Sequence, residues 1–328
     1  DVGSVTHRQL VARFGSASQA LDDGVSPAAA RDAYQRAGEM LDASVPRGME
    51  LTSSADDRYP AALRELHDPP PVLWTIGSWD TLRAPVVAIV GTRRATPYGQ
   101  RITRELAGAL ARAGACIVSG MALGIDAIAH RTALEHDAPT IAVLGTGADV
   151  SYPKAHTALH RDITSRGLLL SELPPGARSD GGSFPRRNRI IAGLATLTIV
   201  VEAPFKSGAL ITSGCAMDLG RDVAAVPGPI DMPQSEGTNQ LIRDGAHIIT
   251  CVADALTLLG LEAPRRSKPE MRDEAERRVW AALLDGASTL DELCSRAALP
   301  VAQCLSAVTG LELRGAVECA LTGEIRRR

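Results

Sequence analysis

The stretch that decides the fold is Val86-Val87-Ala88-Ile89-Val90-Gly91, five apolar residues that end at a glycine. A continuous apolar run of this length is typical of a strand that is buried on both faces. After it, from about Tyr98 to Ala113, apolar residues recur at helical spacing, and Gly114 is a helix stop. The pattern is therefore a strand, a glycine turn and a helix, which opens a βαβ unit.

The same alternation continues to residue 249. Further strands are predicted at 116–118, 140–144, 168–170, 196–201, 222–226 and 246–249, with helices at 125–135, 156–164 and 209–219. Strands that alternate with helices of this length form a parallel sheet with helices on both faces. We therefore predict an α/β fold whose parallel-sheet domain spans residues 85–260.

Smaller parts flank this sheet domain. Residues 1–45 are predicted to form a small helical domain, and the proline-rich residues 46–84 an extended strap that leads into the sheet domain. Residues 261–271, rich in proline and charge, are predicted to be a linker. Three helices and a hairpin are expected in residues 272–328, which is the pattern of a winged-helix domain.

The composition excludes several classes of protein. The chain has 328 residues, of which 45% are hydrophobic, and no apolar run is long enough to span a membrane. Six scattered cysteines without a CxxC pair argue against a zinc ribbon or a disulfide framework. No secretory signal opens the chain, so we expect a cytoplasmic protein without membrane contact; a start at Asp1 rather than at methionine is compatible with trimming.

Charge is unevenly distributed along the chain. The whole sequence has a formal net charge of −3, yet residues 85–250 hold 16 basic and 14 acidic residues, a net +2. The segments on either side are net negative. A local basic site in the middle segment can therefore bind an anion although the whole chain is acidic.

Two of the predicted loops follow early strands, at the sheet edge where ligands of open parallel sheets bind. The first contains Gly91, Arg93 and Arg94, whose guanidinium groups suit phosphate; the alternative is a pair of solvated surface arginines. The second begins with Ser119 and Gly120 and opens a helix, whose N-terminal N–H groups favour anions. Within it, Asp126 and His130 are equally well explained as a helix-start residue and a packing histidine.

Two later loops carry a similar signal. Arg186, Arg187, Asn188 and Arg189 fall in what we expect to be a fixed loop after Phe184-Pro185, with a solvated charge run as the alternative. Lys206, Ser207 and Gly208 follow the next strand and open a helix, which is again favourable for an anion. Four such loops at one sheet edge predict a phosphate-binding site.

Motifs of other chemistries are missing from the sequence. There is no G-x-G-x-x-G dinucleotide fingerprint, no P-loop, no G-x-S-x-G or H-E-x-x-H motif, and no metal-ligand spacing. Glu172 and Glu202 are expected to cap helices or form local salt bridges. We therefore predict no catalytic residue, no metal and no cofactor.

Several long strings together point to a family. They are Val90-Gly91-Thr92-Arg93, Ser119-Gly120-Met121-Ala122-Leu123-Gly124-Ile125-Asp126, Phe184-Pro185-Arg186-Arg187-Asn188-Arg189-Ile190-Ile191-Ala192-Gly193 and Ser207-Gly208-Ala209-Leu210-Ile211-Thr212, with further matches at 59–63, 68–73, 220–228 and 236–246. In this order they resemble the DprA/Smf family of bacterial DNA-processing proteins, over about two thirds of the chain.

The resemblance implies an extended Rossmann domain that binds single-stranded DNA and has no enzymatic activity. It implies that the protein protects incoming DNA and loads the RecA recombinase onto it during natural transformation, competence and DNA recombination, with single-strand-binding protein as a further partner and a homodimer as the assembly. It assigns the basic pocket to Arg93, Arg187, Arg189 and Lys206, with backbone donors at Gly91, Ser119, Gly120, Ser207 and Gly208 and adjacent candidates at Arg94 and Arg186.

Two other functions are weighed against this one. The same type of fold resembles nucleotide phosphoribohydrolases, but their P-G-G-x-G-T-x-x-E string is missing here. A nucleotide-sensing regulator would use the winged helix to read duplex DNA. The predicted third helix of that module, from Val301, has no lysine or arginine before Arg314, so we expect it to contact protein or to bind DNA weakly.

Overall fold

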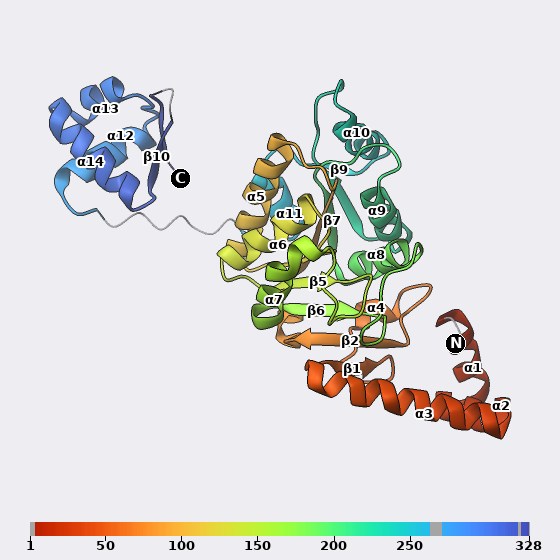
Figure 1. Ribbon diagram of the computed structural model, residues 1–328. Helices are drawn as coiled ribbons and strands as arrows, with labels where there is room; N and C mark the ends of the chain where they lie inside the picture. Colours follow the sequence, from red (N-terminus) through yellow and green to blue (C-terminus); the bar gives the residue numbers. More distant parts are fainter. Residues whose placement is uncertain (1–3, 263–270, 321–322, 328) are drawn as a thin grey trace. The chain divides into compact units, whose positions relative to one another are not determined.

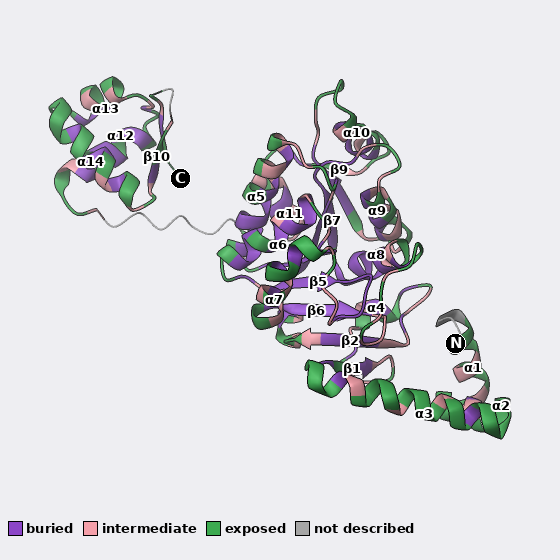
Figure 2. Ribbon diagram, in the orientation of Figure 1, coloured by how far each residue is buried: buried purple, intermediate pink, exposed green. Residues whose placement is uncertain are grey.

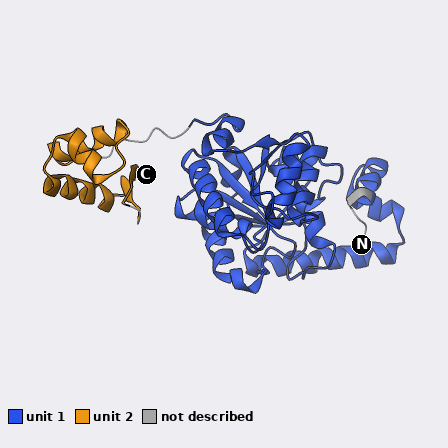
Figure 3. Cartoon of the chain, turned by 90° about the horizontal axis from the view of Figure 1, so that it is seen from above, with its two compact units in different colours: residues 1–264 blue, residues 265–328 orange. Residues whose placement is uncertain are grey.

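The computed structural model describes residues 4–262, 271–320 and 323–327. Contacts divide the chain into two compact units, residues 1–264 and 265–328, which are described separately (Figure 3). The predicted linker lies mostly outside the described residues. Within the described residues, no helix combines the length and the apolar character needed to cross a membrane.

A nine-stranded sheet with the order β1-β2-β6-β5-β4-β3-β7-β8-β9 forms the centre of the first unit (Figure 1). From β6 to β9 every neighbouring pair is parallel. The strands of this part are β3 (Val86–Val90), β4 (Cys116–Ser119), β5 (Thr140–Val143), β6 (Leu168–Ser171), β7 (Leu197–Val200), β8 (Asp222–Ala225) and β9 (His247–Ile248). The predicted α/β fold with its parallel sheet is confirmed.

The apolar run Val86–Val90 forms the central strand β3. Val86, Ala88 and Val90 pack into one hydrophobic cluster and Val87 and Ile89 into another, so both faces of the strand are buried (Figure 2). Helices α5 (Pro97–Arg112), α6 (Ile125–Glu135) and α11 (Val252–Leu258) cover the second face; α4 (Ala61–Arg64), α8 (Ser183–Leu194), α9 (Gly208–Asp218) and α10 (Glu236–Arg243) cover the first. Helix α7 (Thr157–Arg166) packs near β6.

The prediction that residues 46–84 form only an extended strap is wrong. Strands β1 (Glu50–Ser53) and β2 (Val72–Gly77) lie in this segment, and β2 joins the sheet antiparallel to β6. The prolines at 69–71 precede β2 rather than interrupt it, so they do not remove any of its ladder hydrogen bonds. Leu73 and Trp74 of β2 are buried in different hydrophobic clusters, one on each face of the sheet.

A second correction concerns residues 184–193, which are helical and not a fixed loop. They belong to α8, whose residues Ile190, Ile191 and Leu194 recur at helical spacing and are buried against the sheet. Pro185 falls in the first turn, where no intrahelical N–H bond is lost. The arginines of this segment therefore project from a helix whose orientation is set by its apolar face.

Both ends of the chain carry the predicted helices. The amino-terminal ones are α1 (Ser4–Phe14), α2 (Ala17–Gly24) and α3 (Pro27–Ser44); the second unit has α12 (Glu274–Leu284), α13 (Leu290–Ala297) and α14 (Val301–Leu313), followed by β10 (Val317–Cys319) and β11 (Ile325–Arg327), which pair antiparallel. Short 3₁₀ helices are η1 (Val45–Arg47), η2 (Trp79–Arg83), η3 (Lys154–His156) and η4 (Pro233–Ser235). Three helices and a hairpin around one core match the predicted winged helix.

Candidate nucleic-acid interface

A cavity of about 500 Å³ opens at the carboxyl edge of the sheet, where β3 and β7 end. The helix that follows β3 is α5 and the one that follows β7 is α9, and these two cover opposite faces of the sheet. This is the topological switch point, where open α/β sheets bind their ligands. The predicted residues that line the cavity are Gly91, Arg93, Arg94, Arg187, Asn188, Ser207 and Gly208. We refer to it as the basic cavity.

Arg93 and Arg94 are the exposed cations of the basic cavity. Among the described residues neither forms an ion pair, and the backbone N–H of Arg94 donates to Thr92 Oγ1 at 3.2 Å. The loop itself is anchored, because Thr92 N donates to the carbonyl oxygen of Glu202 at 2.7 Å. Two free guanidinium groups on an anchored loop are well placed to bind phosphate.

Lys206 lies at the same edge, next to Ser207 and Gly208 of the cavity wall. It is exposed, has a φ of 61°, and its Nζ lies 5.5 Å from the ring centroid of Phe205. Lys206 has no carboxylate partner within the described part of the chain. Ser207 is the N-cap of α9, but its hydroxyl caps no N–H and finds no partner among the described residues. The start of α9 is therefore open toward the cavity.

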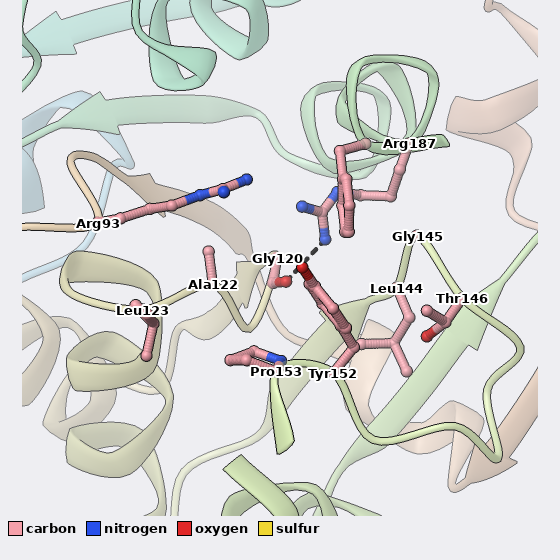
Figure 4. Close-up of a pocket in the computed structure, with 11 residues that line it drawn as sticks. Arg93, Gly120, Ala122, Leu123, Leu144, Gly145, Thr146, Tyr152, Pro153 and Arg187 are labelled. Carbon is pink, nitrogen blue, oxygen red and sulfur yellow. Dashed lines mark hydrogen bonds between the residues drawn. The ribbon is translucent and has the colours of Figure 1, made fainter. Parts of the chain in front are cut away.

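Arg187 differs from these cations because it is buried, with 5% of its surface exposed. Its guanidinium donates to the carbonyl oxygen of Gly120 at 2.7 Å (Figure 4). It also donates to the carbonyl oxygen of Val143. Burial lowers the pKa of Arg187 to about 10, against the opposing effect of Asp126. Arg187 therefore joins the ends of β4 and β5 at the wall of the cavity, and its guanidinium already has two carbonyl acceptors within the protein.

Arg186 and Arg189 are already paired with a carboxylate. Glu172 accepts from Arg186 Nε at 3.1 Å and from Arg189 Nη2 at 2.8 Å, and Asp68 lies 3.6 Å from Arg189 Nε. The side chains of Arg189 and Glu172 are each only 12% exposed. These local salt bridges match the expectation for Glu172 and leave little charge for a ligand.

Ser119 and Gly120 also use their polar groups within the protein. Ser119 Oγ donates to the Ile89 carbonyl at 2.7 Å, and Gly120 N donates to the Asp126 carboxylate at 3.1 Å. Burial raises the pKa of Asp126, although Arg187 and the backbone donors favour its charged form. A Cβ on Gly120 would lie 2.5 Å from the Arg187 guanidinium. This loop therefore supports the cavity and does not present free donors to it.

Glu202 occupies the position where a Rossmann fold holds a pyrophosphate. The buried carboxylate accepts from Thr96 N at 3.0 Å and from Thr96 Oγ1, at the start of α5. A Cβ at Gly99 would lie 2.2 Å from it. The carboxylate of Glu202 therefore occupies the N-terminus of α5, the helix that follows the central strand β3. This agrees with the absence of a G-x-G-x-x-G motif from the sequence.

A pair of aromatic rings lies beside the basic cavity, and one of them, Tyr152, was not predicted from the sequence. The rings of Tyr152 and Phe184 lie 5.2 Å apart, and the Arg93 guanidinium lies 5.8 Å from the Phe184 centroid. With Gly145 and Thr146 these residues line a smaller adjoining pocket (Figure 4). Tyr152 lies beyond the end of β5, so the strand-end rule indicates its loop, and Lys154 just after it is a further exposed cation.

Comparison with known proteins identifies the family. The profile of DNA recombination-mediator protein A matches residues 50–260, and that of the DprA winged helix domain matches residues 262–320. The chain belongs to the DprA/Smf family. It is 39% identical over 311 residues to a DNA processing protein DprA of Mycobacterium tuberculosis, covering 88% of this chain and 80% of that protein. It is 45% identical over 204 residues to DprA of Streptococcus pneumoniae, covering 62% and 72%.

Solved structures of DprA/Smf proteins share the fold. The crystal structure of Streptococcus pneumoniae DprA superposes with a TM-score of 0.67 at 37% identity, covering 77% of this chain and 91% of that one. A Helicobacter pylori DNA processing protein A, described for its single-stranded DNA binding mode, gives a TM-score of 0.59 at 34% identity, covering 64% and 95%. The predicted family is confirmed, and with it a DNA-processing role.

Proposed function

We propose that this chain is a non-catalytic protein that binds single-stranded DNA at the basic cavity. The observation that carries the proposal is that Arg93, Arg94 and Lys206 are exposed at one sheet edge and form no ion pair with any described residue. Phosphates of a strand neutralise these cations, and the Tyr152–Phe184 pair offers stacking to a base. The binding mode described for the Helicobacter pylori relative supports the choice of ligand.

Single strands are preferred over duplex because the cavity is a local hollow with aromatic rings beside its cations. Flexible, unstacked nucleotides can place a base against Tyr152 and a phosphate on Arg93, whereas a duplex keeps its bases paired inside. Neither contact reads a sequence, so binding is expected to be independent of sequence. Because it depends on phosphate neutralisation, the affinity is expected to fall steeply with salt.

The biological role follows the family. We propose that the protein acts in the cytoplasm, protects incoming DNA, and loads RecA onto it in natural transformation and recombination. Single-strand-binding protein is then the competitor to be displaced, and a homodimer through the Rossmann domain is the working assembly. The domain boundaries after residues 45, 260 and 271 belong to the same proposal, with the winged helix as an accessory module.

A competition titration tests the proposal. A fluorescent thymine strand is bound by the full chain and then challenged with unlabelled single strand or duplex of equal length. We expect the single strand to compete at a concentration at least tenfold lower than the duplex. Equal competition, or hydrolysis of nucleoside monophosphates by the same preparation, would contradict the proposal. RecA filament formation on strands coated with single-strand-binding protein, with and without this chain, tests the loading step.

A further inference from the structure

A second pocket lies at the same carboxyl edge, between the start of α5 and the loop that follows β8. Its volume is about 390 Å³. The residues that line it are Thr96, Tyr98, Glu202, Pro227, Gly228, Pro229, Met232 and Ser235. We refer to it as the proline-lined pocket. None of the anion-binding loops predicted from the sequence accounts for it.

The chemistry of the lining excludes a phosphate. Two prolines, Met232 and the ring of Tyr98 supply apolar walls, and the one charged group among the described lining residues is the carboxylate of Glu202. Arg101 lies over the Tyr98 ring, at 5.7 Å from its centroid, and does not line the pocket. A carboxylate without a facing cation repels an anion, whereas apolar and aromatic walls favour a flat, uncharged ring.

The pocket is also held in shape by hydrogen bonds. The Tyr98 hydroxyl donates to the Pro227 carbonyl at 3.0 Å. The Asn239 side chain accepts from Gly228 N at 3.2 Å and donates to Gly228 O at 3.0 Å. Since these contacts fix the loop against α5 and α10, binding of a ring would order few further groups and its entropic cost would be small.

The proline-lined pocket and the basic cavity are neighbours along two segments of chain. Gly91 to Arg94 line the basic cavity, and Thr96, two residues on, lines the second pocket. Likewise Glu202 lines the second pocket and Pro204 the basic cavity. The 2.7 Å bond from Thr92 N to Glu202 O joins the two segments. The segments that line the two sites are therefore held together at the sheet edge.

We infer that the proline-lined pocket holds one uncharged base of the same DNA strand whose phosphates bind in the basic cavity. This inference rests on the proposed function. A DNA strand carries a charged phosphate and an uncharged base in every nucleotide. The basic cavity suits the phosphate, and the proline-lined pocket suits the base. Met232, 40% exposed and unbranched, can adapt its side chain to purine or pyrimidine.

A matched control for substitutions of Met232 lies two residues before it in the sequence. Ile230 belongs to the same loop and is 97% exposed, but it does not line the pocket. Ile230→Asp and Met232→Asp add the same charge at nearly the same place. Any difference between these two variants therefore reports on the interior of the pocket and not on the charge of the loop.

Affinities are measured for a thymine strand and for a strand of equal length and charge that carries abasic sites. We expect Met232→Asp to weaken binding of the thymine strand at least fivefold more than Ile230→Asp does, and both variants to bind the abasic strand equally. A base stacked in a protein site contributes about 1–3 kcal/mol, for which fivefold is the lower limit. Met232→Ala repeats the comparison with Ile230→Ala if the charged variants fail to fold.

Equal losses for the two variants on both strands would overturn the inference, and so would unchanged binding by Met232→Asp. A different outcome separates this inference from the proposed function. The wild-type chain binds the thymine strand, Arg93→Ala weakens that binding, and the Met232 variants bind like their Ile230 controls. In that case only this inference fails. If the wild-type chain binds no strand at all, the proposed function fails with it. If Met232→Asp still binds DNA but binds a protein partner less well than Ile230→Asp does, the pocket belongs to that partner instead.

Discussion

The clearest consequence of the structure is that arginines predicted for the same site differ in their availability to DNA. Arg93 is exposed and pairs with no carboxylate in the described part of the chain, whereas Arg189 is held by Glu172 at 2.8 Å and by Asp68 at 3.6 Å. Removing Arg93 removes a charge-assisted hydrogen bond to phosphate, worth about 1–2 kcal/mol, or 5- to 30-fold in affinity. Lys206→Ala should behave in the same way, because Lys206 is equally free.

The salt dependence separates the two kinds of arginine. Each phosphate contact on a single strand contributes about −0.7 to the slope of log K against log salt. Arg93→Ala should therefore make the slope shallower by about 0.7 without changing the unfolding midpoint. Arg189→Gln should leave the slope unchanged but lower the free energy of unfolding by ~1–3 kcal/mol, because a largely buried carboxylate loses a partner.

The assay is fluorescence anisotropy with a thymine strand at four or more salt concentrations, with chemical denaturation of each variant as the control for folding. The reasoning is refuted if Arg189→Gln flattens the salt slope as much as Arg93→Ala does. It is also refuted if Arg93→Ala binds like the wild type, since the ligand would then lie elsewhere.

Three further predictions concern stability and the accessory unit. Gly120→Ala should lower both stability and DNA affinity, because its Cβ would lie 2.5 Å from the Arg187 guanidinium; a melting curve like that of the wild type would contradict this. Burial lowers the pKa of His130 to about 3. Near pH 6.5 only the unfolded chain therefore binds a proton at His130. This difference should lower the free energy of unfolding by about 2 kcal/mol from pH 8 to pH 5. Denaturation of wild type and His130→Gln at both pH values measures this component, which the variant should lack. Deleting residues 272–328 should reduce single-strand affinity by less than tenfold, and a hundredfold loss in the same titration would make the winged helix a primary DNA site.

Much of the fold could be predicted because its signals are local. The run Val86–Val90 is buried along its whole length, and strands β4 to β7 repeat that pattern. Strand β2 was missed because it pairs with β6, about a hundred residues away, and nothing within the segment reveals that pairing. Strand β1 was missed with it, because β1 pairs only with β2 among the described strands. Helix α8 was missed because Pro185 and the arginines obscured the helical spacing of Ile190, Ile191 and Leu194.

The candidate site was predictable in position but not in detail. Strand ends locate the loops, so Arg93, Arg94 and Lys206 could be proposed from the sequence. Whether an arginine is free depends on carboxylates that only the fold brings near, such as Glu172 beside Arg189. The direction of Arg187 is equally a tertiary property, since its acceptors Gly120 and Val143 belong to other elements of the sheet domain.

The central claim is that DNA lies across the carboxyl edge of the sheet, and cross-linking tests it most directly. A strand containing 4-thiothymine is bound to the full chain, irradiated, and the modified peptides are identified by mass spectrometry. The account predicts cross-links in the segments that contain Arg93, Tyr152, Phe184 and Lys206, reduced by excess unlabelled single strand. Cross-links confined to the winged helix, or to the opposite edge of the sheet near Pro139 and Arg221, would contradict it.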